Sequence, residues 1–153
     1  MKSALAFIAW LGISLSAGIV GSQFLPGEWY ASLAKPAWNP PSYVFAPVWT
    51  TLYIMMGVAA WLVWRRAGFR SAPVALGLFL AQLPVNALWS FLFFGIHRPL
   101  LALLDLILLW GLIVVVGLAF RRVSALAAGL LIPYLLWVSF AGILNFSLWR
   151  LNT

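Results

Sequence analysis

Five long apolar stretches occupy almost the whole of this 153-residue chain. A helix needs about 20 mostly apolar residues to cross the hydrocarbon core of a bilayer, and each stretch reaches that length. The sequence therefore predicts an all-α integral membrane bundle of five transmembrane helices, forming one domain over residues 1–153, with one long loop between the first and second helices. We expect these helices at about residues 4–25, 43–65, 72–96, 99–120 and 123–150.

The composition excludes a soluble domain. Hydrophobic residues make up 65% of the chain and charged residues 7%, whereas a soluble domain is about half apolar and about a quarter charged. The chain has no cysteine and one histidine. Disulfides and thiol nucleophiles are therefore excluded, and we expect no metal site. The net charge of +7 comes from basic residues at loop ends, where they orient a membrane protein, so we expect no nucleic-acid partner.

The basic residues divide unevenly between the two ends of the predicted bundle. One end collects Lys2, Arg65, Arg66, Arg70, Arg121 and Arg122, and the other collects Lys35, Arg98 and Arg150. Basic loops stay on the cytoplasmic side of a membrane. We therefore expect a cytoplasmic amino terminus, with the loop at residues 25–42 facing out. Helical spans favour the inner membrane of a bacterial cell.

Polar residues within the spans fall in one half of the predicted bundle. Lipid penalises unpaired polar groups, so polar residues inside spans indicate a site or a helix contact. At 1.5 Å per residue, Asn86 lies about 13 Å and Asp105 about 9 Å from the outer edge. Thr50, Thr51, Tyr53, Ser139 and Asn145 fall in the same half. We interpret this as an outer-half pocket with residues 25–42 as its lid.

Several of these residues have a second interpretation. Asp105 is the only acid in any span, and it either reaches a ligand, is simply protonated, or pairs with Arg98 near the interface. Asn86 either reaches a ligand or joins two helices. The tryptophans at positions 29, 38 and 49 surround the proposed mouth, and Trp137 lies mid-bundle. Aromatic walls bind large flat molecules, which favours a planar, mostly apolar ligand.

Particular motifs resemble one known family. The loop reads Lys35-Pro36-Ala37-Trp38-Asn39-Pro40-Pro41, and the last span contains Ile132-Pro133-Tyr134-Leu135-Leu136-Trp137. Between and after them come Gln82-Leu83-Pro84-Val85-Asn86-Ala87-Leu88-Trp89-Ser90, then Asp105, then Leu144-Asn145-Phe146. Over nearly its whole length the chain resembles the TspO/MBR family of tryptophan-rich sensory proteins and translocator proteins, also known as peripheral-type benzodiazepine receptors.

The resemblance implies a five-helix bundle, usually a homodimer, that binds protoporphyrin IX or a haem-type tetrapyrrole, and also sterols and benzodiazepine-type ligands. Its implied pocket lining is Trp29, Trp38, Trp49, Tyr53, Asn86, Trp89, Ser90, Asp105, Trp137, Ala141 and Asn145. The implied dimer contact is the third helix, where Gly77 and Ala81 would allow close approach. The sterol-recognition pattern calls for a tyrosine where this chain has Phe146, which weakens the expectation of sterol binding.

Three functions follow from these observations. The leading hypothesis is a membrane receptor or carrier of porphyrins that acts in tetrapyrrole regulation or stress sensing. The second is a light-dependent porphyrin-degrading enzyme, with Trp49 and Trp137 as its candidate residues, since the sequence offers no ordinary acid–base pair or nucleophile. The third is a small-molecule transporter, which is ranked lower because five helices do not divide into two equal repeats.

Overall fold

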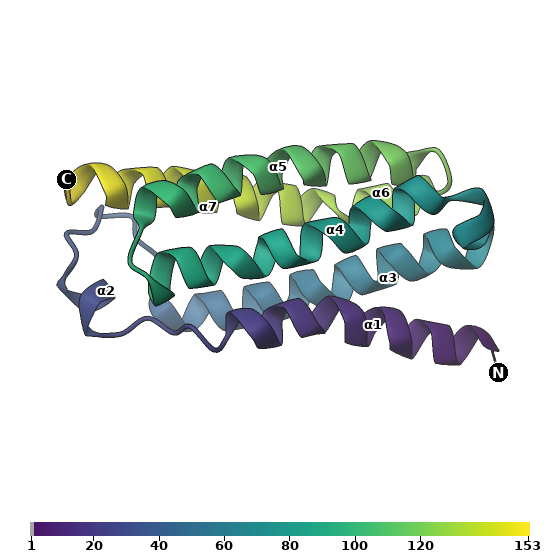
Figure 1. The fold of residues 1–153 in the computed structure, drawn as a ribbon, viewed down its shortest axis with the longest axis horizontal. Helices are drawn as coiled ribbons and strands as arrows, with labels where there is room; N and C mark the ends of the chain where they lie inside the picture. The colour runs from purple at the N-terminus through teal and green to yellow at the C-terminus, as the bar shows by residue number, and fades with distance from the viewer. Residues whose placement is uncertain (1) are drawn as a thin grey trace.

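Five apolar helical spans form the body of the molecule in the computed structural model, which describes residues 2–153 (Figure 1). The elements are α1 (Lys2–Gly21), α2 (Glu28–Ser32), the 3-10 turn η1 (Ser42–Val44), α3 (Phe45–Ser71), α4 (Pro73–Ser90), the π-helical turn η2 (Phe91–Gly95), α5 (Pro99–Arg121), α6 (Ala125–Leu130) and α7 (Ile132–Leu151). Helices α6 and α7 together make the fifth span. The predicted five-helix membrane bundle is confirmed.

Several helix ends differ from the expected positions, for local reasons. Helix α1 ends at Gly21 rather than near residue 25, and the following residues already belong to the loop. Helix α3 continues past residue 65 to Ser71, with a break at Gly68, where φ is +62°. Glycine has no Cβ and adopts this left-handed conformation without strain. The last span is interrupted at Leu131. The interruption lies two residues before Pro133, whose ring disfavours continuation of the preceding helix.

The two ends of the bundle carry different segments (Figure 1). One end holds α2, the long loop, the turn between α4 and α5, and the carboxy terminus. The opposite end holds the amino terminus and the turns from α3 to α4 and from α5 to α6. We call these the outer end and the inner end.

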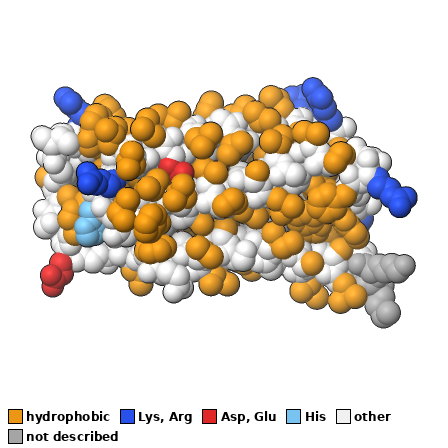
Figure 2. Space-filling model, in the orientation of Figure 1, with side chains coloured by type: hydrophobic (Ala, Val, Ile, Leu, Met, Phe, Trp, Pro, Cys, Tyr) orange, Lys and Arg blue, Asp and Glu red, His pale blue; other side chains and the backbone are white. Residues whose placement is uncertain are grey.

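Apolar side chains cover the sides of the bundle, and the charged side chains lie toward its ends except for one acidic side chain on the body (Figure 2). Ile8, Ile107, Leu136 and Ile143 are each more than 60% exposed. A soluble monomer rarely exposes so much contiguous apolar surface, whereas the hydrocarbon core of a bilayer accommodates it. The protein is an integral membrane protein.

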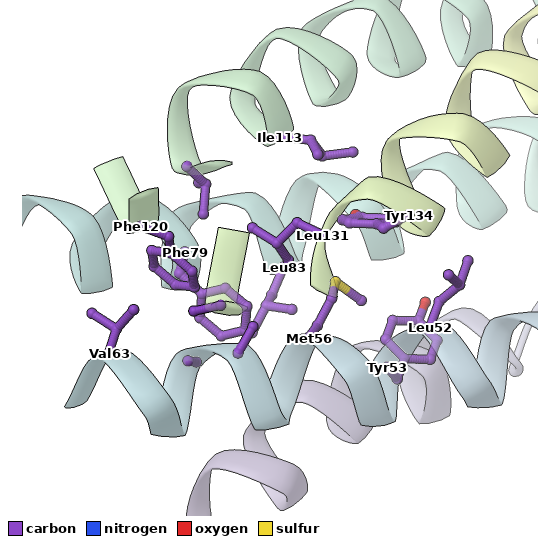
Figure 3. Close-up of a cluster of buried hydrophobic side chains, with 14 of the residues drawn as sticks. Leu52, Tyr53, Met56, Val63, Phe79, Leu83, Ile113, Phe120, Leu131 and Tyr134 are labelled. Atoms are coloured by element: carbon purple, nitrogen blue, oxygen red, sulfur yellow. The ribbon is translucent and has the colours of Figure 1, made fainter. Parts of the chain in front are cut away.

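The inner half of the bundle is closely packed. Val63, Phe79 and Phe120 are fully buried, and the rings of Phe79 and Phe120 stack with centroids 5.9 Å apart (Figure 3). A Cβ at Gly57 would lie 3.0 Å from the Cα of Leu11, so α1 and α3 nearly touch along their backbones. This packing fixes the positions from which the helices enter the outer half.

Candidate functional site

A cavity of about 440 Å³ lies in the outer half, between α1, α3, α4 and α7 and below the long loop. Its volume lies within the range of about 300–1,000 Å³ that is usual for small-molecule sites. Its aromatic lining comprises Phe24, Tyr30, Phe45, Trp49, Tyr53, Trp89, Phe93 and Phe94. Among the described residues, α5 contributes nothing to this lining. The site therefore draws on four of the five spans.

Most residues that the resemblance implies for the pocket do line this cavity. They are Trp49, Tyr53, Asn86, Trp89, Ser90, Ala141 and Asn145. Trp29, Trp38, Asp105 and Trp137 lie outside its lining. The four residues outside the lining fall into two pairs, one on the loop and one on helices α5 and α7.

Trp29 and Trp38 attach the loop to the bundle. Trp29 stacks on His97 with centroids 4.3 Å apart and an interplanar angle of 14°, and its ring also meets the edge of Phe93. Trp38 is 47% exposed and packs edge-on against Phe140 of α7 at 5.9 Å. Both tryptophans therefore hold the loop in place over the cavity.

Asp105 and Trp137 lie away from the cavity, and each has one buried polar atom. Asp105 is 7% exposed on α5, and its Oδ2 has no hydrogen-bond partner within residues 2–153. The Nε1 of Trp137 also lacks a partner in that range. Trp137 packs against Phe45 and Phe140 and lines an open lateral groove of about 540 Å³ between α3 and α7.

A chain of buried hydrogen bonds lies at the floor of the cavity. The Tyr53 hydroxyl donates to Oδ1 of Asn86, and Nδ2 of Asn86 donates to the Tyr134 hydroxyl at 2.8 Å. Tyr134 in turn donates to Oε1 of Gln82 at 2.8 Å. Because lipid offers no hydrogen bonds, these contacts satisfy polar groups that would otherwise be costly in the membrane.

A second set of hydrogen bonds orients the wall formed by Trp89. Its Nε1 donates to Oδ1 of Asn145 at 3.0 Å, and Nδ2 of Asn145 donates to the carbonyl of Pro99 at 2.8 Å. The ring of Trp89 stacks on Phe93 with centroids 5.4 Å apart. Asn145 thus joins α4 to the start of α5 and fixes the plane of the Trp89 indole.

Residues 22–44, which we call the flap, cover the outer end of the cavity. The side-chain amide of Asn152 accepts from the Ala34 N–H and donates to the Ala34 carbonyl, each at 2.9 Å. Lys35 donates to the carbonyls of Ala31 and Leu33 and lies 4.8 Å from the ring centroid of Tyr30. The carboxy-terminal residues therefore hold the flap by contacts between side chain and backbone.

Sequence reasoning missed several residues of the site. A Cβ at Gly18 would lie 2.5 Å from Cε2 of Tyr53, so only glycine lets this tyrosine pack against α1. The pairing of Gln82 with Tyr134 was also missed. Gln82 and Asn86 are four residues apart, which places them on the same face of α4. That spacing was the available signal for a polar layer beneath the cavity.

Comparisons with known proteins agree with these observations. A family model described as the TspO/MBR family matches residues 4–150. The chain is 47% identical to the tryptophan-rich protein TspO of Chlorobaculum tepidum, over 99% of this chain and 98% of that protein. It is 46% identical to the translocator protein of Homo sapiens, over 87% and 82% respectively. It is 38% identical to the tryptophan-rich sensory protein of Cereibacter sphaeroides, over 95% and 90%.

Proposed function

The chain belongs to the TspO/MBR family, and we propose that it is a membrane receptor or carrier that binds protoporphyrin IX or a related flat tetrapyrrole. The observation that carries this proposal is the outer cavity of about 440 Å³ with its aromatic walls. Such a site would act in tetrapyrrole regulation or stress sensing. The names of the relatives, which include a sensory protein, support that role.

The walls of the cavity suit a flat ligand. Trp49 and Tyr53 stack with centroids 5.6 Å apart and planes 26° apart, and Trp89 and Phe93 stack in a similar way at 23°. Paired rings of this kind present broad, rigid apolar faces. A planar macrocycle gains affinity on them from stacking and from buried area.

The packing below the cavity favours binding over transport. Met56 in the floor and Phe79 inward of it are fully buried, and Leu83 is 6% exposed. Within residues 2–153 these side chains fill the space that a path to the inner end would need. A ligand would therefore enter and leave on the outer side, as in a receptor or a carrier that delivers to a partner.

Light-dependent degradation remains a second candidate because an indole lies in the cavity wall. Trp49 lines the cavity, so a bound, photoexcited porphyrin would lie beside an oxidisable ring. Trp137 faces the lateral groove instead, which leaves Trp49 as the sole candidate of the two. Under illumination, the Soret band of bound protoporphyrin would bleach more slowly in Trp49→Phe than in wild type. Equal bleaching rates would remove this candidate.

Titration with protoporphyrin IX tests the receptor proposal, with affinity read from the Soret band. Trp49→Phe should weaken binding by roughly fivefold, because the smaller phenyl ring loses stacking area worth about 1 kcal/mol. Trp61→Phe is the matched control, since Trp61 donates to the Ser3 carbonyl at the inner end. Trp38→Phe and Trp137→Phe should lie closer to wild type. If protoporphyrin does not bind, or if Trp49→Phe and Trp61→Phe lose affinity equally, the proposal is wrong.

We also infer the orientation in a bacterial inner membrane. The inner end carries Arg65, Arg66, Arg70, Arg121 and Arg122, and basic residues stay in the cytoplasm. The flap would then face outward. Because the chain has no cysteine, a single Ser32→Cys change provides a clean label site. A membrane-impermeant maleimide should label it in intact cells, and Ser71→Cys should be labelled only after lysis.

A further inference from the structure

The floor of the cavity has a fixed hydrogen-bond direction. Three helices contribute to it: Tyr53 and Met56 from α3, Gln82 and Asn86 from α4, and Tyr134 from α7. All five side chains are buried, at 7% exposure or less. Figure 3 shows Tyr53, Met56 and Tyr134 within the buried cluster. In such surroundings each polar atom depends on its protein partner, so the arrangement of protons is constrained.

Met56 fixes the orientation of the Gln82 side-chain amide. Nε2 of Gln82 lies 3.8 Å from Sδ of Met56. A thioether sulfur has no hydrogen and can only accept. The amide NH2 of Gln82 must therefore face the sulfur, because the opposite orientation would place two acceptors against each other and leave a buried carbonyl unsatisfied. The Gln82 carbonyl then faces Tyr134.

The orientation of Gln82 determines the direction of the remaining hydrogen bonds up to Tyr53. The Gln82 carbonyl accepts, so Tyr134 uses its single proton there. Tyr134 can then only accept from the Asn86 NH2, which turns the Asn86 carbonyl toward Tyr53. Tyr53 uses its single proton on that carbonyl. The Tyr53 oxygen therefore has only lone pairs left to offer.

The phenol end of Tyr53 lies at the cavity wall. Tyr53 and Asn86 both line the cavity, so the hydrogen bond that joins them belongs to the cavity wall. The ring of Tyr53 also packs closely against Gly18 of α1. The indole N–H of Trp89, which also lines the cavity, already donates to Asn145.

We propose that the Tyr53 oxygen selects ligands that insert an N–H or O–H donor at their leading edge, and that Gln82, held by Met56, sets this preference from a distance. The inference rests on the proposed function and adds a preference among the ligands of that cavity: of two flat apolar molecules of similar shape, the one with a hydrogen-bond donor on its rim binds more tightly. Tyr53 touches the ligand, and Gln82 is a positioning residue.

Three flat probes of nearly equal shape test this selection: carbazole, with an N–H donor, dibenzofuran, with an acceptor oxygen, and fluorene, with neither. Each is titrated by competition against protoporphyrin IX, so that all report on the same cavity. Wild type should bind carbazole about tenfold more tightly than dibenzofuran, because a donor completes one hydrogen bond whereas an acceptor leaves two lone pairs opposed. Fluorene should lie between them.

Variants of the chain then separate contact from positioning. Tyr53→Phe should bring the three affinities together. Gln82→Leu should also reduce the ratio of carbazole to dibenzofuran affinity toward one, since Tyr134 can then donate to Asn86 and free the Tyr53 proton for the cavity. Met56→Leu, a substitution of similar volume that protein cores tolerate, should reduce the ratio of carbazole to dibenzofuran affinity by a smaller amount than Gln82→Leu. Ser139→Ala is the control, because Ser139 bonds Trp110 outside this chain of contacts and should keep the full ratio.

The outcomes are distinguishable. Equal affinities for the three probes in wild type would overturn the selection while leaving the receptor proposal intact. A ratio lost in Tyr53→Phe but unchanged in both Gln82→Leu and Met56→Leu would overturn the role of Gln82. If protoporphyrin and the probes all fail to bind, the proposed function is wrong and the inference fails with it. Because the readout is a ratio, a variant with reduced overall stability remains interpretable.

Discussion

The inner and outer halves of the bundle differ in how their helices meet. In the inner half, Gly57 brings α3 within contact of the α1 backbone, and Phe79 and Phe120 fill the centre. In the outer half the same helices separate around a cavity of about 440 Å³. Large aromatic residues occur in both halves. What differs is whether their rings fill the space between helices or line it.

The comparison shows how a membrane protein keeps an unfilled site. A void lacks the packing contacts that a filled core provides, so it must be held open by neighbours that are themselves fixed. Here the fixed parts are the closed inner half, the polar floor of Tyr53 and Asn86, and the flap held by Asn152. Polar groups gather in the outer half because they satisfy one another there.

The largest effect is expected from a change in the inner half. Phe79→Ala removes a fully buried ring and should lower the free energy of unfolding by about 3 kcal/mol or more. The affinity of the folded fraction for protoporphyrin should remain close to that of wild type, because Phe79 lies outside the cavity lining. Thermal unfolding and Soret titration in the same detergent measure the two effects. A large loss of affinity would show that the two halves are not separable.

A change at Gly18 should give the converse result. Gly18→Val places a Cβ 2.5 Å from the Tyr53 ring, so the ring must move and its bond to Asn86 must break. We expect the affinity for protoporphyrin to fall by about tenfold or more, because the variant loses a buried hydrogen bond and the displaced Tyr53 ring alters the cavity wall. Gly12→Val is the control, since Gly12 has no neighbouring atom within 4 Å. Equal behaviour of the two variants would contradict this picture of the floor.

The flap should control how fast the ligand leaves. Asn152→Ala removes both hydrogen bonds to Ala34, at a cost of about 0.7 kcal/mol each because both are exposed to solvent. The dissociation rate of protoporphyrin should rise roughly tenfold, as measured by stopped-flow displacement. Thr153→Ala, which loses only a bond to its own helix, should leave the rate unchanged. An unaltered rate in Asn152→Ala would mean that the flap does not limit escape.

Asp105 offers a smaller test of which residues belong to the outer site. Its Oδ2 has no partner among the described residues, and buried unpaired polar groups cost about 1–3 kcal/mol. Asp105→Leu should therefore raise the thermal stability and leave the porphyrin affinity unchanged. Asp105→Asn should raise the thermal stability by a smaller amount. A loss of affinity in both variants would show that the carboxyl reaches the ligand.

The smallest effect on the single chain is expected at Gly77. Gly77 and Ala81 lie exposed on the inner half of α4, with no atom within 4 Å of a Cβ at Gly77. If a homodimer forms through these small residues, Gly77→Leu should weaken chemical crosslinking in the membrane without altering affinity. Gly111→Leu on α5 is the matched control. Unchanged crosslinking would place the dimer contact elsewhere.

Parts of the site could be predicted from the sequence, and others could not. Depth and motif together predicted Trp49, Asn86 and Asn145 for the pocket, and the structure places these three in the lining of the outer cavity. Asp105 lies at a similar depth to Asn86, yet it sits outside the lining. Depth gives the height of a residue in the membrane, and only packing gives the direction in which its side chain points.

The sequence alone determined that the chain crosses the membrane as five helices and which half of the bundle holds its polar groups. Hydrophobic length and the penalty for unpaired polar groups in lipid are properties that each segment carries by itself. Only the tertiary structure decided that α5 stays out of the cavity, that Gly18 admits Tyr53, and that Met56 orients Gln82. These depend on contacts between residues far apart in the chain, where small differences in helix rotation determine which atoms meet.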